Sequence, residues 1–240
     1  MDRLPYLFCD AVVGTISDFD ELQKQLELFE NSRFSKWKLA FEDHNSNRQK
    51  FRIWIVFVDG SWSYEFYKFP DKEGESGFCD FKTVQQLRRK YLQITTVDYA
   101  ENVCENISSF KEINEITKFI SPFVNLASLD LCNKQIEEIN LSLLLNHFRN
   151  SRCQFTELKV NHYRPCYEEL LFTQLRSDFM ENVEIRGDNW PKEVQLEVEE
   201  FVLKKSFETV FCEKSNLLFE RPFFENLFEL PKPKEEMWFD

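Results

Sequence analysis

The residues that most often carry chemistry are few and scattered in this chain. Histidine occurs only at positions 44, 147 and 162, and the seven cysteines form no C-x-x-C pair. His162 and Cys166 are four residues apart, with Cys153 nearby, which is a usable spacing for metal ligands. Pro165 interrupts a helix there, however, and no second closely spaced pair of ligands follows. The sequence therefore predicts no metal site and no cofactor.

The sequence does not indicate catalytic side chains either. Glu42, Asp43 and His44 could act as an acid–base group, but the exposed end of a helix is the better explanation. Glycine occurs only at positions 14, 60, 74, 77 and 187, which excludes glycine-rich phosphate loops. There is also no G-x-S-x-G turn, and nothing selects one cysteine as a nucleophile. We expect no catalytic residues and no enzyme; an unrecognised α/β enzyme is the catalytic alternative.

An apolar spacing that returns five times is a stronger signal. It has the form apolar-x-x-apolar-x-apolar, and its starts are 32, 29, 25 and 27 residues apart. The five sets are Ile94, Val97 and Tyr99; Leu126, Leu129 and Leu131; Phe155, Leu158 and Val160; Met180, Val183 and Ile185; and Phe207, Val210 and Cys212. Helical segments are expected near 109–121, 136–150, 166–177 and 191–205. This period predicts stacked strand–helix units, because one unit cannot bury its own apolar face.

Alternating strands and helices predict parallel strands joined by right-handed crossovers. A doubly wound sheet and a short curved solenoid both fit, and the near-constant period favours the solenoid. So does the scarcity of glycine at the strand ends, where a doubly wound nucleotide-binding fold needs it. In each unit the third and fifth positions after the start should point inward, and the second, fourth and sixth outward. The central outward positions form a net acidic ribbon: Asp98, Asp130, Lys159, Glu184 and Phe211.

We expect this outward face to bind a protein with a basic patch, since opposite charges attract. The predicted partner-binding residues are Asp98, Asp130, Glu157, Lys159, Glu184 and Arg186. A solvated edge of an α/β sheet is the alternative explanation of the same pattern.

The segment before the repeats changes from helical to strand character. Apolar residues from Phe19 onward recur at helical spacing, with Asp18 as N-cap, and a second helix is expected over 34–41. Strands over 51–58 and 62–69 flank Asp59-Gly60, which predicts a hairpin, and another helix is expected over 81–90.

The expected fold class is α/β, with N-terminal helices and a β-hairpin followed by a short strand–helix array of parallel strands. Four segments follow from this: helical residues 1–48, the hairpin and connecting helix over 49–90, the repeats over 91–230, and an extended tail over 231–240. The apolar end of the tail can dock on the domain or stay free.

Two stretches resemble known families. Leu126 to Asn133, with Ile136 and Ile139, is similar to a leucine-rich repeat, so the array resembles divergent repeats of that kind. Leu4-Pro5, the aliphatic residues that follow at helical spacing, and Ser35-Lys36-Trp37 resemble an F-box. The run from Trp37 through Arg48 into the next strand is similar to a nematode-type, expanded group of F-box and F-box-associated proteins.

The F-box resemblance implies a substrate-recognition subunit of a cullin-type ubiquitin ligase. Its N-terminal segment would bind a Skp-type adaptor, and its C-terminal domain would bind the substrate protein. The residues that match the adaptor-binding anchors are Leu4, Pro5, Val12, Ile16, Leu22 and Trp37. Simple packing of these side chains on the hairpin is the alternative, as is a freestanding recognition or scaffold domain without a ubiquitin link.

Composition and net charge indicate which classes of partner and which cellular compartment to expect. The net charge of −12 argues against a dedicated nucleic-acid or anionic-membrane binder, and 42% apolar residues exclude disorder. No stretch approaches 18 apolar residues, which predicts no membrane span. The dispersed cysteines and the absence of a long apolar stretch near Met1 are typical of a reducing compartment, so we expect a cytoplasmic or nuclear protein.

Overall fold

The computed structural model describes most of the chain, and it divides the chain into two compact units. The described residues are 5–14, 16, 24, 35–70, 76–100, 104, 106–131, 135–151, 153–161, 164–204, 207–229 and 236–239. One unit comprises Met1–Phe51 and Phe66–Gln93, and the other comprises Arg52–Glu65 and Ile94–Asp240. The four segment boundaries drawn from the sequence stay predictions.

The first unit contains the N-terminal helices. Its elements are α1 (Tyr6–Gly14), α3 (Ser35–Asn47), β3 (Gly77–Cys79), α4 (Phe81–Gln86), the short 3-10 helix η1 (Arg89–Tyr91), and parts of the hairpin strands. Helix α3 is longer than the predicted 34–41. The single helix predicted over 81–90 is wrong, because Leu87 takes an extended backbone (φ −69°, ψ 152°) that ends α4 before η1 begins.

Helices α1 and α3 pack through a small apolar cluster. Cys9, Val13, Ala40 and Phe41 are buried at its centre. The side chains packed around them are Tyr6, Ile16 and Trp37. This cluster is too small to stabilise two helices by burial alone, so polar contacts must contribute to their docking.

The predicted hairpin is confirmed. Strands β1 (Gln49–Val58) and β2 (Ser61–Lys68) are joined by Asp59 and Gly60, which have φ angles of 50° and 79°. Two consecutive residues with positive φ form the type I′ turn that matches the twist of paired strands, and glycine takes that conformation without strain.

The second unit is an alternation of strands and helices. Its elements are β4 (Leu92–Ala100), β5 (Asn106–Ser108), α5 (Phe110–Ile120), η2 (Ser121–Phe123), β6 (Val124–Leu131), α6 (Glu138–Asn150), β7 (Gln154–Val160), α7 (Pro165–Leu175), β8 (Asn182–Arg186), α8 (Lys192–Lys204), β9 (Thr209–Glu213), α9 (Arg221–Glu229) and β10 (Glu236–Phe239). The four helices predicted between the repeats are confirmed within a few residues. Among the described residues, no helix is long and apolar enough to span a bilayer.

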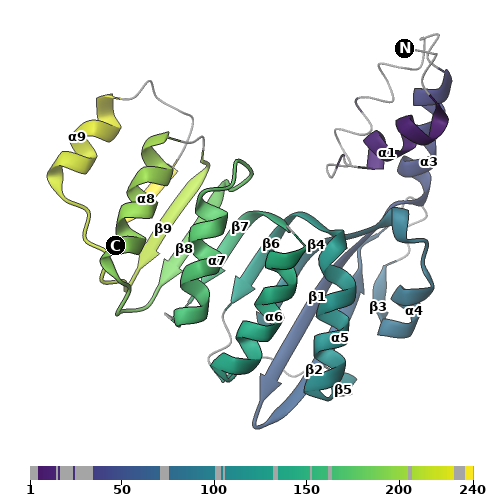
Figure 1. Cartoon of the computed structure of the whole chain (residues 1–240), viewed down its shortest axis with the longest axis horizontal. Coiled ribbons are helices and arrows are strands. Elements are labelled where there is room, and N and C mark those ends of the chain that lie inside the picture. The colour runs from purple at the N-terminus through teal and green to yellow at the C-terminus, as the bar shows by residue number, and fades with distance from the viewer. Residues whose placement is uncertain are drawn as a thin grey trace. The chain divides into compact units, whose positions relative to one another are not determined.

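The strands of the array pair in parallel. The described sheet has the order β10-β9-β8-β7-β6-β4-β1-β2-β3, with β5 on β2, and its parallel pairs run from β4 through β6 to β10. Helices α5, α6, α7 and α8 all lie on one face of these strands (Figure 1). A doubly wound sheet would place helices on both faces. The α/β class with a parallel strand–helix array is therefore confirmed, and β10 extends it by pairing with β9.

The predicted alignment of the outward positions is also confirmed. Asp98 pairs in register with Asp130, Asp130 with Lys159, Lys159 with Glu184, and Glu184 with Phe211. These five positions therefore form one row across the strands.

The predicted inward positions, the third and fifth after each start, are all buried. Leu126 is only half-buried and has a φ of 50°, and the fully buried Ala127 pairs with Phe155 in its place. Leu126, the apolar start of the second unit, thus lies outside the core, unlike the buried starts Ile94, Phe155, Met180 and Phe207. One extra residue bulges out of β6 at this point and shifts the register, which returns to the predicted alignment at Ser128.

Two adjacent residues of β7 test which face is the core. Leu158 is fully buried and Lys159 lies on the opposite face. We expect Leu158→Ala to lower the free energy of unfolding by about 2–5 kcal/mol, because it removes buried methyl groups and leaves a cavity. Lys159→Ala should change it by less than about 1 kcal/mol, because exposed ion pairs contribute little. Urea unfolding measures both; equal losses would contradict the assignment of faces.

Candidate functional site

The outward face of the array is the surface that the sequence singled out. Helices α5 to α8 lie on one face of β4, β6, β7, β8 and β9 (Figure 1), and the side chains that alternate with the buried ones face away from these helices. Most of these outward side chains are half-buried. We call this surface the open face; its outward positions are Thr96, Asp98, Ser128, Asp130, Glu157, Lys159, Asn182, Glu184, Arg186, Thr209, Phe211 and Glu213. All six predicted partner-binding residues lie on it.

Ion pairs order the cations of the open face. Lys159 Nζ lies 3.0 Å from Glu157 Oε1. Arg186 lies 2.6 Å from Glu184 and 3.1 Å from Glu213, and its guanidinium is 5.7 Å from the centre of the Phe211 ring. Each cation is thus balanced by at least one carboxylate. The acidic residues on these strands outnumber the basic ones, so the net charge of the open face is negative.

Asp98 and Asp130 concentrate the negative charge. Asp98 is buried, and its Oδ2 lies 2.5 Å from Nη2 of Arg52 on β1. Burial, with a smaller contribution from Asp130, raises the pKa of Asp98, while Arg52 opposes the rise. Oδ1 of Asp130 is shielded from solvent and accepts no hydrogen bond from the described residues. Arg52 therefore balances Asp98, and no hydrogen bond from the described residues reaches Oδ1 of Asp130.

Nothing in the sequence pattern pointed to Arg52 as part of this site, and the structure places it there. Its guanidinium contacts Asp98 and lies 4.6 Å from the centre of the Trp54 ring. Strand β1 lies outside the repeat, so periodicity did not connect it with β4. The available signal was the alternation in β1, where buried Ile53 and Ile55 imply that Arg52 and Trp54 face the other way.

The predicted adaptor-binding residues divide between surface and core. Leu4 and Leu22 lie outside the described residues. Pro5 is exposed, Val12 is 37% exposed on α1, and Ile16 and Trp37 pack against the α1–α3 cluster.

Three further apolar side chains of the same helix pair are exposed. Leu7 and Phe8 on α1 are 77% and 49% exposed, and Leu39 on α3 is 55% exposed. The Phe8 ring meets Trp37 edge-on at 6.3 Å. An apolar surface thus exists on α1 and α3. It includes Val12 from the predicted set, but Leu7, Phe8 and Leu39 were not predicted.

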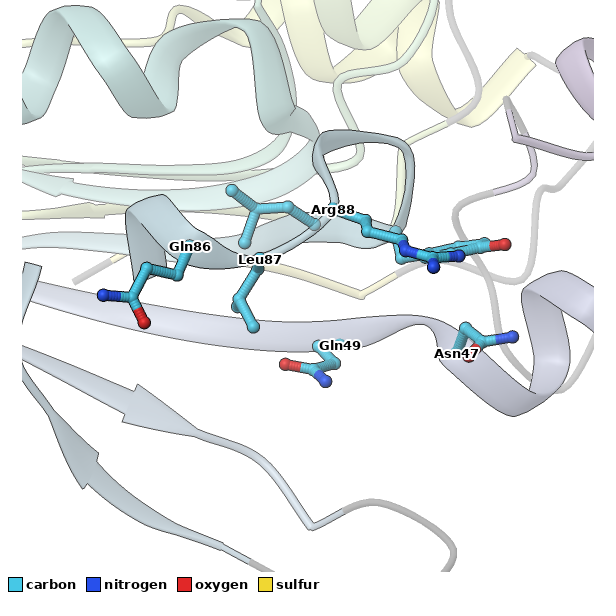
Figure 2. Close-up of a pocket in the computed structure, with 7 residues that line it drawn as sticks. Asn47, Gln49, Gln86, Leu87 and Arg88 are labelled. Carbon is cyan, nitrogen blue, oxygen red and sulfur yellow. The ribbon is translucent and has the colours of Figure 1, made fainter. Parts of the chain in front are cut away.

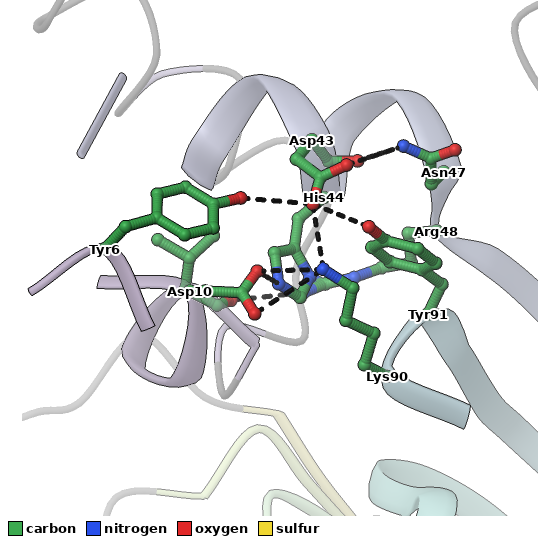
Figure 3. Close-up of polar contacts among 9 residues, drawn as sticks. Tyr6, Asp10, Asp43, His44, Asn47, Arg48, Lys90 and Tyr91 are labelled. Carbon is green, nitrogen blue, oxygen red and sulfur yellow. Dashed lines mark hydrogen bonds and ion pairs between the residues drawn. The ribbon is translucent and has the colours of Figure 1, made fainter. Parts of the chain in front are cut away.

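A polar cluster connects α1, α3 and η1, and the sequence did not predict it. Figure 3 shows Lys90 between the carboxylates of Asp10 and Asp43. Oδ2 of Asp43 accepts hydrogen bonds from Tyr91 (2.6 Å), Lys90 (2.9 Å) and Tyr6 (3.2 Å). Burial acts to raise the pKa of Asp43, but these hydrogen bonds outweigh it and hold the pKa below its ordinary value.

His44 lies at the buried end of the cluster. Its Nε2 is 3.1 Å from Asp10 Oδ1, and its Nδ1 is 3.4 Å from Arg48 Nη2. Because a guanidinium can only donate, Nδ1 accepts and the ring proton belongs on Nε2. Burial and the charge of Arg48 lower the pKa of His44, against the opposing effect of Asp10. A Cβ at Gly14 would come within 3.3 Å of the ring, so the close approach of α1 favours glycine there.

Arg48 holds the C-terminal end of α1. Its guanidinium donates to the carbonyl of Val13 at 3.1 Å and to the carbonyl of Ile16. Helix ends leave carbonyls without helical partners, so a buried donor here stabilises both the helix end and its position on α3. Burial lowers the pKa of Arg48 to about 10, and the side chain therefore stays charged at neutral pH.

These groups form a network of hydrogen bonds and ion pairs that joins α1, α3 and η1. Each of the charged and tyrosyl side chains in it is bonded to another member. Burial raises the pKa of the Cys153 and Cys212 thiols to about 12 and of the Cys104 and Cys166 thiols to about 11, so these stay protonated at neutral pH. Within the described residues, no group of three histidine, cysteine or acidic side chains could hold a metal ion.

Comparison with known proteins identifies no family for this chain. No family model matches the chain, and neither a curated protein nor a solved structure is significantly similar to it. The F-box and leucine-rich-repeat resemblances therefore stay predictions.

Acid should loosen α1 from α3. Because its folded pKa lies below the ordinary 6.5, neutral His44 contributes stability above about pH 6.5, and this stability is lost as the pH falls through the folded value. Asp43 changes its charge only at lower pH, since its pKa lies below 3.8. We expect the protection of the α1 amides against hydrogen exchange, corrected for the intrinsic exchange rate at each pH, to fall below pH 6.5.

His44→Gln should remove this loss of protection, because glutamine does not titrate. His147 on α6 also has a pKa lowered by burial, so His147→Gln is the matched control and should keep the loss of protection in α1. An unchanged pH profile in His44→Gln would exclude His44 as the cause.

Proposed function

We propose that this chain is a non-enzymatic protein-interaction module whose open face binds a partner protein with a basic patch. The observation that supports this is the in-register row of Asp98, Asp130, Lys159 and Glu184 on a sheet face without a described helix. Neighbouring strands lie about 4.8 Å apart, so the row presents charges at a fixed spacing.

The ion pairs on the open face favour binding in a second way. Lys159, Arg186 and Arg52 are held by neighbouring carboxylates, so their long side chains have already lost part of their rotamer freedom. Binding to ordered side chains costs less conformational entropy than binding to free ones. The excess of carboxylates would steer a basic partner to this face and make association sensitive to salt.

A second contact is proposed for the N-terminal helices. Leu7, Phe8 and Val12 on α1 and Leu39 on α3 expose apolar surface that water solvates poorly. Together with the F-box resemblance, this supports binding of a Skp-type adaptor, which would make the chain a substrate-recognition subunit of a cullin-type ubiquitin ligase in the cytoplasm or nucleus. A freestanding recognition or scaffold domain keeps the open-face interaction and lacks the adaptor.

Charge reversal tests the open face. In Asp130→Lys with Glu157→Lys, we expect capture of basic protein partners by the tagged protein to fall at least about tenfold, because two attractive charges become repulsive. The matched control is the double variant Glu193→Lys with Glu200→Lys, which makes the same change of charge on exposed positions of α8. Quantitative affinity purification and unfolding curves measure both variants. Equal capture by the folded variants would contradict the proposal.

Replacing exposed apolar residues tests the adaptor contact separately. Leu7→Ser with Phe8→Ser should abolish co-purification of a Skp-type adaptor while leaving capture through the open face intact, because it removes apolar area from α1 only. The control is Leu196→Ser with Leu218→Ser, two exposed leucines of the second unit. If the unaltered protein captures no such adaptor, the freestanding alternative holds.

A further inference from the structure

A small pocket lies in the first unit, beside the polar cluster. It has a volume of about 240 Å³ and is lined by Asn47, Gln49, Gln86, Leu87, Arg88, Tyr91 and Leu92. Figure 2 shows Leu87 pointing toward Gln49 on β1, with Arg88 reaching toward the end of the pocket where Asn47 lies. The pocket therefore has a charged end, amide groups along its length and apolar walls.

The charge of Arg88 is not balanced within the described part of the protein. Its side chain makes no hydrogen bond or ion pair with any described residue. The neighbouring carboxylate of Asp43 is fully used, because its Oδ2 accepts from Tyr6, Tyr91 and Lys90 and its Oδ1 accepts from Asn47 at 2.9 Å. Arg88 is exposed, so its charge is open to a ligand, and no acidic side chain among the described residues pairs with it.

We propose that this pocket binds a carboxylate group of a peptide segment, with Arg88 as its charged ligand. A guanidinium presents two parallel N–H donors that match the two oxygens of a carboxylate. The side chains of Gln49 and Gln86 each carry a donor and an acceptor, which suits the peptide groups that accompany a carboxylate. Leu87 and Leu92 offer contacts to the methylene groups of the bound residue.

The size of the pocket limits the ligand. A volume of about 240 Å³ accommodates roughly one or two residues, whereas sites for drug-sized molecules typically start at about 300 Å³. A glutamate side chain and the C-terminal carboxylate of a peptide provide the same chemistry. The open face plays no part in this site, so the proposal stands independently of the proposed function.

The test is an NMR titration of the ¹⁵N-labelled full-length protein with three capped amino acids. Acetyl-glutamate amide carries a side-chain carboxylate, acetyl-alanine a terminal one, and acetyl-glutamine amide none. We expect saturable shifts of the Arg88 Nε–H and the Gln49 and Gln86 side-chain amides with at least one of the first two, at a dissociation constant on the order of 1 mM, because a single exposed ion pair contributes little. The ligand with the lower dissociation constant shows whether the pocket prefers a glutamate side chain or a C-terminal carboxylate.

The variant Arg88→Gln should weaken binding about two- to fivefold, because it removes the one exposed ion pair with the ligand. Lys82→Gln is the matched control: it removes one exposed cation from α4, outside the pocket, and should leave the affinity unchanged. Sulfate is titrated as a fourth probe. The proposal would be overturned by equal losses in the two variants, by equal binding of acetyl-glutamine amide, by tighter binding of sulfate, or by no saturable shift with either carboxylate.

Discussion

The burial of one face of the parallel strands is the constraint on which the second unit depends. Val97, Leu129, Leu158, Val183 and Val210 are all buried and occupy matched register positions on five strands. Side chains of a strand alternate between faces, so a slip of one residue would bring charged neighbours into the core. The same packing that forms the core therefore fixes which charged side chains face away from the helices, and in what order they align across the sheet.

Most of the array could be predicted because its signals are local. Apolar spacing identified the strands and Asp59-Gly60 identified the hairpin turn. The spacing did not reveal the bulge in β6, since Leu126 and Ala127 are both apolar and only the three-dimensional register decides which one is buried. The contact of Arg52 with Asp98 spans 46 residues and joins strands outside any common repeat, so one sequence alone does not reveal it.

The polar cluster of the first unit was missed for a related reason. Lys90 reaches Asp10 across 80 residues, and Arg48 reaches the carbonyl of Val13 across 35. In the sequence, Asp43 and His44 are consistent with a solvated helix end, yet His44 is almost fully buried. Buried polar groups are costly unless bonded, and here each bond also fixes the direction in which α1 lies on α3. The network therefore supplies orientation that the small apolar cluster cannot.

The two units use their charged groups in different ways. On the open face, Lys159 and Arg186 are paired internally, so the excess of carboxylates determines what that face attracts. In the pocket, the pairing of Lys90 with Asp10 and Asp43 leaves Arg88 without an acidic partner among the described residues. A protein of strongly negative net charge can thus hold a local site of the opposite preference, because partner choice depends on which charges remain unbalanced at each surface rather than on the total.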